Sequence, residues 1–310
     1  MRVQFVLTPT ESKKLLSKAV MQTDSFKRAF EAGTIVIHPS STTVFIMSEL
    51  GFALDPDALW ICGLTAPRGL CASAQILEEV YRAGKFEPQK YTHSWVIQKG
   101  EWVRERLLLN EMLSQLKKGD LYIKSPNSID AEGNVGILFT ATGAGTVGLV
   151  MKAQRKQHFE ILLPTGLEKL INRPIREICR ETPKHAMNFC TGTPCGLIPV
   201  QGTVLTELDA VKILSGAESY MVAAGGVGGA EGAVVLSAKG DEGQIRKASE
   251  ILGSVKGATL PSLRLLECRE CKRTKCHLSP VFDFGLIPEG GWMVPEAYKA
   301  RVKRNDHPKS

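Results

Sequence analysis

The chain has 310 residues, of which 43% are hydrophobic and 23% are charged. This length corresponds to about two domains of ordinary size, and the composition is that of a folded globular protein, which excludes a wholly disordered chain. The formal net charge of +7 is compatible with the binding of small anions. A nucleic-acid partner is not favoured, because only 6% of the residues are aromatic and the basic residues form no concentrated stripe.

The longest apolar runs, such as residues 34–37 and 161–163, are far below the ~18 residues that cross a bilayer. Residues 1–7 are too short to form the apolar region of a signal peptide. We therefore expect a cytoplasmic protein with no membrane partner. The eight cysteines are then expected to be reduced thiols rather than disulfides.

The first half of the chain alternates between predicted helices and predicted strands. Thr8 or Thr10 is a candidate N-cap of the first helix, and Gly33 is a candidate C-cap of the second. The apolar spacing predicts helices over residues 8–20, 24–31, 44–50, 72–83, 105–116 and 145–157. It predicts strands over residues 34–37, 60–63, 92–97, 120–124, 135–140 and 159–163. This alternation predicts an α/β domain over residues 1–175, with a mostly parallel sheet and helices on both faces.

The second half predicts a smaller domain after a hinge at residues 174–183. Strands are expected over residues 196–200, 219–224, 232–237 and 258–266, and helices over 206–214 and 241–252. This β-α-β-β-α-β order predicts a ferredoxin-like α+β domain over residues 184–266, a fold name that implies no iron. The glycines at 225–229 are interpreted as a tight turn between two strands. Residues 267–310 form a cysteine-rich tail with a basic end, and we expect the basic end to be solvated.

Two segments are candidate anion-binding sites. Ser40, Ser41, Thr42 and Thr43 follow the strand at 34–37 and open a helix, where hydroxyls and unpaired amides attract anions. His38, directly before them, adds positive charge when it is protonated. The alternative is that these hydroxyls only cap the helix and form a solvated turn.

The second candidate is a glycine loop that comprises Gly143, Gly145, Thr146 and Gly148. It follows a predicted strand and opens a helix, as a phosphate-binding loop does. Glu168 lies at the nominal distance of a ribose-binding acid but beyond the expected strand end, so a nicotinamide cofactor is not favoured. A phosphate or carboxylate cradle and tight strand–helix packing remain the two interpretations.

The order of these motifs resembles a known superfamily. The segment 38–43 looks like the phosphate loop of ribose-5-phosphate isomerases. Residues 120–134 are similar to a strand and loop shared by sugar-phosphate isomerases, coenzyme A transferases and lactate-utilisation proteins, and Asn127 lies in that loop. Residues 166–169, Gly-Leu-Glu-Lys, are most similar to the lactate-utilisation proteins. The resemblance covers residues 1–175 and implies a three-layer α/β fold with the ligand at the carboxyl ends of the strands.

Asp130, Glu168 and Lys169 are the candidate catalytic residues. A carboxylate beside a lysine at a sheet edge is suited to proton transfer on a sugar or acyl substrate. The alternative is a solvated ion pair that contributes only ~0–1 kcal/mol.

Cys268, Cys271, Cys276 and His277 are candidate metal ligands. Thiolates at this short spacing suit zinc or a [4Fe–4S] cluster. A closed site needs a fourth ligand, for which His277, Cys190 and Cys195 are candidates. Reduced thiols or a disulfide remain the alternative.

Three functions follow from the sequence. The first is an isomerase-like or transferase-like enzyme that acts on a small phosphorylated or acyl metabolite, including a coenzyme A ester. The second is a non-catalytic sensor or assembly subunit that binds such a metabolite. The third is a zinc or iron–sulfur protein whose site lies in the C-terminal cysteine cluster. A homodimer is expected, since ferredoxin-like sheets often pair.

Overall fold

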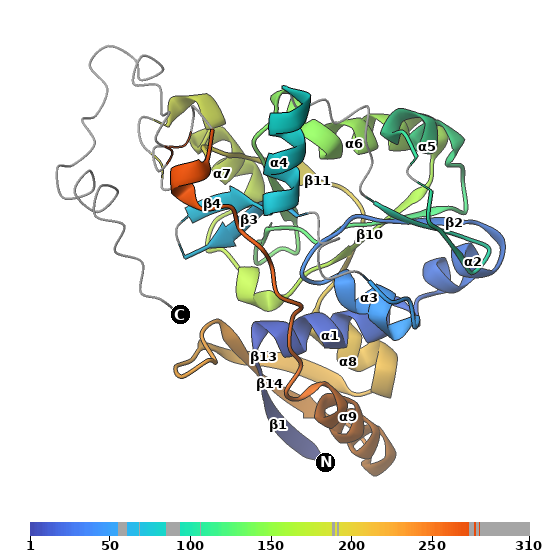
Figure 1. Ribbon diagram of the computed structural model, residues 1–310. Coiled ribbons are helices and arrows are strands. Elements are labelled where there is room, and N and C mark those ends of the chain that lie inside the picture. The colour runs from blue at the N-terminus through green and yellow to red at the C-terminus, as the bar shows by residue number, and fades with distance from the viewer. Residues whose placement is uncertain are drawn as a thin grey trace.

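The computed structural model is a mixed α/β protein, as the sequence predicts (Figure 1). It describes residues 1–54, 61–67, 69–84, 94–105, 107–187, 190, 192–272, 276 and 279. His277 and the basic segment 299–309 lie outside these residues, as does Trp60 at the start of the strand expected at 60–63.

The largest sheet has six strands in the order β12–β10–β7–β2–β5–β6. Its parallel part consists of β12 (Thr203–Leu205), β10 (Glu160–Pro164), β7 (Leu121–Ile123) and β2 (Thr34–Ile37). The antiparallel edge is the hairpin of β5 (Trp95–Gln98) and β6 (Glu101–Val103). The parallel strands direct their carboxyl ends to one edge, where α/β proteins commonly bind ligands.

Helices cover both faces of this sheet. On one face, Ile35 and Ile37 join a core with α1 (Pro9–Val20), α2 (Asp24–Ala32) and α3 (Val44–Glu49). On the other face, Val36 and Tyr122 pack with α5 (Leu109–Gln115) and α6 (Gly145–Gln157). Because successive strand residues point to opposite faces, the short apolar strands supply both cores at once.

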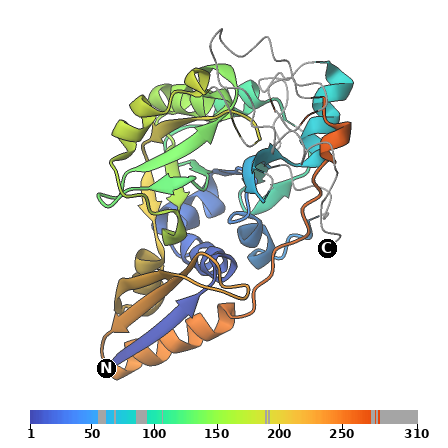
Figure 2. The same ribbon diagram turned by 90° about the vertical axis from the view of Figure 1, so that its left-hand side faces the viewer.

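A second, three-stranded antiparallel sheet has the order β1–β14–β13. It consists of β1 (Arg2–Leu7), β14 (Ala233–Lys239) and β13 (Glu218–Gly225), with α8 (Glu207–Ser215) and α9 (Glu242–Val255) packed against it. Figures 1 and 2 show α1 between this sheet and the six-stranded sheet. One continuous core joins the two sheets through α1.

This topology corrects the expected ferredoxin-like domain. The strand predicted at 196–200 forms as β11 (Gly196–Val200), but it pairs with β9 (Val135–Phe139) and β8 (Ser128–Ile129) in a separate sheet. Residues 258–266 form no strand. Instead, β1 from the other end of the chain pairs with β14 and completes the sheet. The hairpin turn is confirmed, and Gly226 is required there because a Cβ would lie 1.9 Å from Ala230 O.

The hinge expected at residues 174–183 is also wrong. Residues Ile175–Glu181 form α7, and Ile175 is fully buried. Pro174 is the N-cap residue of this helix, so the prolines that suggested a hinge lie at the two ends of a helix instead.

The remaining elements form a small unit beside the main sheet. β3 (Cys62–Ala66) and β4 (Gly69–Ala72) form a hairpin that leads into α4 (Ala74–Ala83). After α9 the chain runs back to α4, where Ala74 N donates to Arg264 O at 2.8 Å (Figures 1 and 2).

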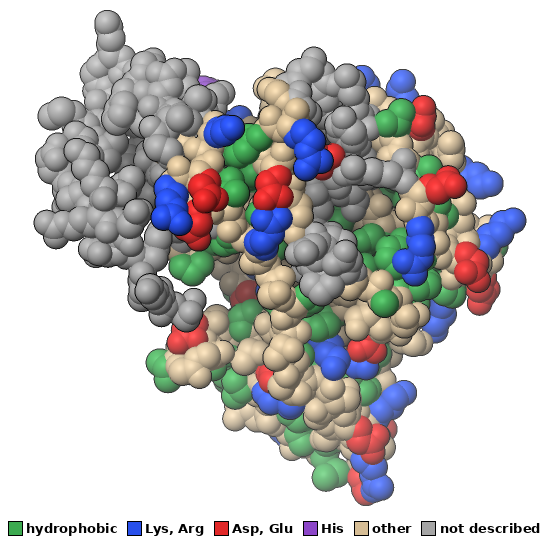
Figure 3. All heavy atoms as spheres, in the orientation of Figure 1, with side chains coloured by type: hydrophobic (Ala, Val, Ile, Leu, Met, Phe, Trp, Pro, Cys, Tyr) green, Lys and Arg blue, Asp and Glu red, His purple; other side chains and the backbone are tan. Residues whose placement is uncertain are grey.

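Charges of both signs are mixed on one face of the molecule. On the face in Figure 3, the described Lys and Arg side chains are interspersed with Asp and Glu. Within the described ranges, every helix is too short or too polar to cross a membrane.

Glu11 fixes the orientation of α1. Its carboxylate accepts from Thr8 N at 2.9 Å in a capping box, and from Lys256 Nζ at 2.7 Å and Gly257 N at 2.9 Å beyond the end of α9. Burial raises the pKa of Glu11, but these hydrogen bonds and the Lys256 charge outweigh burial and leave the pKa below its ordinary value.

We predict that Glu11→Gln lowers the free energy of unfolding by about 1–3 kcal/mol at pH 7, because a charged hydrogen-bond acceptor is lost. The depressed pKa means that this stabilisation is present above the unfolded-state pKa and is lost as the pH falls through the folded-state value. The two proteins should therefore converge in urea titrations once the pH falls below the depressed folded-state pKa of Glu11. Glu242→Gln, which removes an exposed pair with Arg246, is the control and should change stability by less than about 0.5 kcal/mol.

Candidate functional site

The four parallel strands each deliver a polar residue to one place beyond their carboxyl ends. Thr42 follows β2 and Ser125 follows β7. Glu168 and Lys169 follow β10 in a short 3-10 helix, η4 (Leu167–Lys169), and Glu207 follows β12. Hydrogen bonds and one ion pair connect the side chains of Thr42, Ser125, Glu168 and Lys169. Glu207 interacts electrostatically with Glu168 and Lys169, and these residues together are called here the strand-end cluster.

A chain of hydroxyls links the strand-end cluster to α1. Lys169 Nζ donates to Ser125 Oγ at 2.9 Å, and Thr42 Oγ1 donates to the same oxygen at 3.2 Å. Ser17 Oγ of α1 donates to Thr42 O at 2.9 Å. The ammonium group of Lys169 is therefore linked through Ser125 and Thr42 to α1.

Glu168 has an uncommitted carboxylate oxygen. Its Oε1 lies 4.0 Å from Lys169 Nζ, whereas Oε2 is buried and has no hydrogen-bond partner among the described residues. Gly166 makes this position possible, because a Cβ there would lie 1.8 Å from Glu168 Oε2. The side chains of Glu168 and Lys169 keep 12% and 19% of their surface exposed.

Lys13 and Glu207 complete the strand-end cluster, and the sequence patterns do not single them out. Burial lowers the pKa of Lys13, and the negative charge of Glu168 partly offsets this by raising it. Burial also lowers the pKa of Lys169, with Glu168 opposing the shift and Lys13 adding to it. Two lysines thus face Glu168 in a mostly dry environment.

Glu207 is fully buried beside this group. Both of its carboxylate oxygens accept from Leu167 N, at 3.1 and 2.9 Å. Burial and then the charge of Glu168 raise the pKa of Glu207 to about 7. A carboxyl group that is partly protonated at neutral pH can both give and take a proton.

The turn at Ser40–Thr43 is largely satisfied from within. Ser40 Oγ accepts from Thr42 N at 3.3 Å and Thr43 N at 3.1 Å, and Thr43 Oγ1 donates to His38 O at 2.7 Å. Of the predicted anion ligands in this segment, Thr42 is the one that contacts Ser125. Ser41 lies between Ser40 and Thr42 in this turn and is half-buried.

His38 lies on the other side of the six-stranded sheet. Its Nδ1 is 3.3 Å from the hydroxyl of Tyr122, which belongs to the core with α5 and α6. His38 is buried there, beside the Tyr122 hydroxyl.

Asp130 and Asn127 hold the loop after β7. The Asp130 carboxylate accepts from Ile175 N at 2.9 Å, Glu132 N at 3.0 Å and Asn134 N at 2.9 Å. Burial raises the pKa of Asp130, but these hydrogen bonds outweigh it and lower the pKa overall. Asn127 Oδ1 accepts from Leu138 N at 2.9 Å and thereby anchors β9.

The glycine loop also lies apart from the strand-end cluster. It follows β9 of the separate sheet, and α6 behind it packs on the Tyr122 face of the main sheet. Gly143 and Gly145 have positive φ angles of 64° and 55°. A Cβ at position 148 would lie 1.9 Å from Gly143 O, so close backbone packing requires a glycine there. Thr146 is in the first turn of α6.

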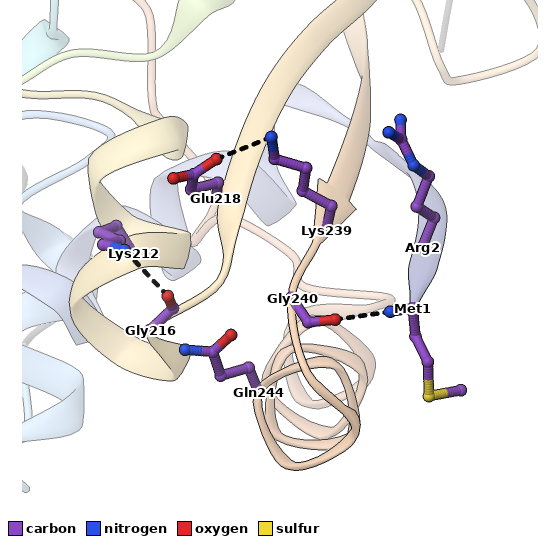
Figure 4. A pocket seen from close by; sticks show the side chains of 8 residues that line it. All are labelled: Met1, Arg2, Lys212, Gly216, Glu218, Lys239, Gly240 and Gln244. Carbon is purple, nitrogen blue, oxygen red and sulfur yellow. Dashed lines mark hydrogen bonds and ion pairs between the residues drawn. The ribbon is translucent and has the colours of Figure 1, made fainter.

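A shallow hollow of ≈ 690 Å³ lies at the outer end of the second sheet (Figure 4). Its basic residues are Arg2, Lys212 and Lys239. Lys239 Nζ pairs with Glu218 at 3.1 Å, and Lys212 Nζ donates to Gly216 O at 3.1 Å at the end of α8 (Figure 4). The two lysines are thus already paired within the fold, and the residues that line the hollow include no buried titratable group comparable to Glu207.

No protein-family model, curated protein or solved structure gives a significant match to this chain. The interpretation of the site therefore depends on its own geometry.

We predict that Glu207→Gln changes how stability depends on pH. Because the folded-state pKa is raised to about 7, the stabilising contribution of the neutral acid is full below the unfolded-state value and is lost as the pH rises through 7. The wild type should lose on the order of 3 kcal/mol from this group between pH 4.5 and pH 8. The variant should lose no stability from this group. In urea titrations its free energy of unfolding should therefore rise relative to that of the wild type as the pH rises. Parallel curves for the two proteins would contradict the assignment.

Proposed function

We propose that this protein is an enzyme that transfers protons on a small phosphorylated or acyl metabolite bound at the strand-end cluster. The observation that carries the proposal is the meeting of two lysines and two glutamates, in a mostly buried place, at the carboxyl ends of parallel strands. Buried titratable groups that shift one another's pKa values are typical of acid–base sites.

The strand-end cluster suits an anion. Lys13 and Lys169 face one carboxylate, Glu168, and one carboxyl group, Glu207, whose pKa of about 7 leaves it partly neutral at pH 7. With both ammonium groups charged, the excess charge is positive. Ser125 and Thr42 add hydroxyl donors of the kind that phosphate and carboxylate groups accept.

The side chains divide the chemistry between them. Glu168 is the base that takes a proton from the carbon next to a carbonyl group, because its Oε2 has no hydrogen-bond partner among the described residues. Lys169 stabilises the negative charge that develops on the neighbouring oxygen. Lys169 also exchanges protons with that oxygen, since burial lowers its pKa, and the fully buried Glu207 adjusts the charge around Lys169 through its own raised pKa. The proton on Glu168 then returns to the substrate, which completes an isomerisation.

The sequence resemblance to sugar-phosphate isomerases, coenzyme A transferases and lactate-utilisation proteins supports the same substrate class. We include in this proposal the three-layer fold that the resemblance implies for residues 1–175. The alternative is a sensor that binds the same metabolite and never converts it, which the internal hydrogen bonds of Ser40–Thr43 and Asp130 favour.

The proposal predicts ligand-dependent proton exchange. Phosphosugars and coenzyme A esters are screened by thermal shift, and ligands that raise the melting temperature are incubated with the protein in D₂O. Mass spectrometry should show one deuterium incorporated into the ligand carbon skeleton. Glu168→Gln should keep the thermal shift and slow the exchange by about 10²-fold or more, because the base is lost.

Three further variants separate the roles. Gly166→Ala should slow exchange as well, since its Cβ displaces the Glu168 carboxylate without altering that residue. Lys169→Met should abolish the thermal shift, whereas Lys247→Met on the exposed face of α9 should not. A thermal shift without deuterium incorporation in the wild type would support the sensor instead. No shift with any anion would refute both.

A further inference from the structure

Four cysteines line one small cavity on the α4 side of the molecule. Cys71 comes from β4, and Cys268, Cys271 and Cys276 come from the segment after α9. The cavity has a volume of ≈ 20 Å³. This is slightly more than the ~10–15 Å³ that one water molecule needs, so it has room for one small ion.

The backbone gathers the three C-terminal cysteines. Residues Cys268–Glu270 form one turn of 3-10 helix, and Cys271 N donates to Cys268 O at 3.2 Å. Side chains three residues apart lie on the same side of such a turn. Ser279 then draws the next cysteine close, because its Oγ donates to Cys271 O at 2.6 Å and its N donates to Cys276 O at 2.8 Å.

Tyr81 of α4 supports one of these sulfurs. Its hydroxyl oxygen accepts from Lys272 N at 2.8 Å and lies 3.2 Å from Cys271 Sγ. With its oxygen occupied by that amide, the hydroxyl can direct its own proton at the sulfur. Hydrogen-bond donors of this kind orient metal-bound thiolates and stabilise their charge.

The surrounding unit has little core of its own. Its buried hydrophobic cluster consists of Ala72, Ile76 and Leu77, with Leu266 packed against it. Cores this small usually need a disulfide or a metal ion to hold them together.

We propose that Cys71, Cys268, Cys271 and Cys276 bind one structural zinc ion. Four thiolates around a cavity of this size match a closed tetrahedral zinc site, and each thiol releases its proton to solvent as it binds. Arg269 and Lys272 on the same segment offset the negative charge of the site. In the conformation described, no three His, Cys, Asp or Glu side chains are arranged to hold a metal ion within the described ranges, so the thiols must turn into the cavity on binding.

This assignment differs from the sequence prediction in the fourth ligand. Cys71 precedes the cluster by nearly two hundred residues, and only the packing of β4 against the C-terminal segment brings it there. Cys190 and Cys195 lie on either side of Gly192 and Thr193, which line the cavity, but neither cysteine lines it.

The test measures metal and thiol protection together. The full-length protein is purified anaerobically with added zinc, and elemental analysis should give one zinc per chain. Thiol alkylation followed by mass spectrometry should show these four cysteines protected until a chelator is added. Cys71→Ser should lose most of the bound zinc under a chelator challenge that leaves the wild type loaded. Cys179→Ser in α7, outside the cavity, is the matched control and should retain zinc.

Cobalt substitution provides a second readout on the folded wild type, because thiolate-to-cobalt absorption reports a sulfur-rich tetrahedral site. The proposal is overturned by a chain that binds no zinc, by disulfides among these cysteines in the anaerobic protein, or by iron and sulfide in place of zinc. It is also overturned if Cys71 is alkylated at the same rate with and without zinc.

Discussion

The burial of α1 is the constraint on which the rest of the structure depends. This helix lies between two sheets, and its buried residues include the polar Glu11 and Ser17 as well as Leu15 and Leu16. Burying a polar group without a hydrogen-bond partner costs several kilocalories per mole. Glu11 has such a partner at the end of α9, and Ser17 has one at Thr42. The helix therefore sets the distance between the second sheet and the strand-end cluster.

The sequence predicts the local elements well because their signals are local. Residues 34–37 are predicted and observed as β2, since four apolar residues between Gly33 and a hydroxyl-rich turn leave few alternatives. Helix α1 begins after its predicted Thr8 cap. By contrast, nothing in residues 2–7 identifies residues 234–239 as their partner, and nothing near Thr203 marks it as an edge strand of the large sheet. Such pairings are decided by tertiary packing.

The same distinction applies to the candidate site. Glu168 and Lys169 are detectable because Gly-Leu-Glu-Lys follows a strand, whereas Lys13 resembles an exposed first-turn residue and Glu207 an acid that complements a helix N-terminus. Only their burial, which is a property of the whole fold, indicates that these two residues belong to the candidate site. The sequence feature that could have pointed to Glu207 is its position at the start of a capped helix that directly follows a short strand. Many solvated acids occupy the same position in other helices.

The pairing of β1 with β14 has a consequence for how the chain folds. During synthesis, the first strand leaves the ribosome long before residues 233–239 exist, so it must wait without its partner. Contacts that are so distant in sequence are slow to form, and the waiting strand exposes an unpaired edge. Helix α1 is fully enclosed only after that late pairing, so the strand-end cluster is completed only once residues 233–239 have been synthesised.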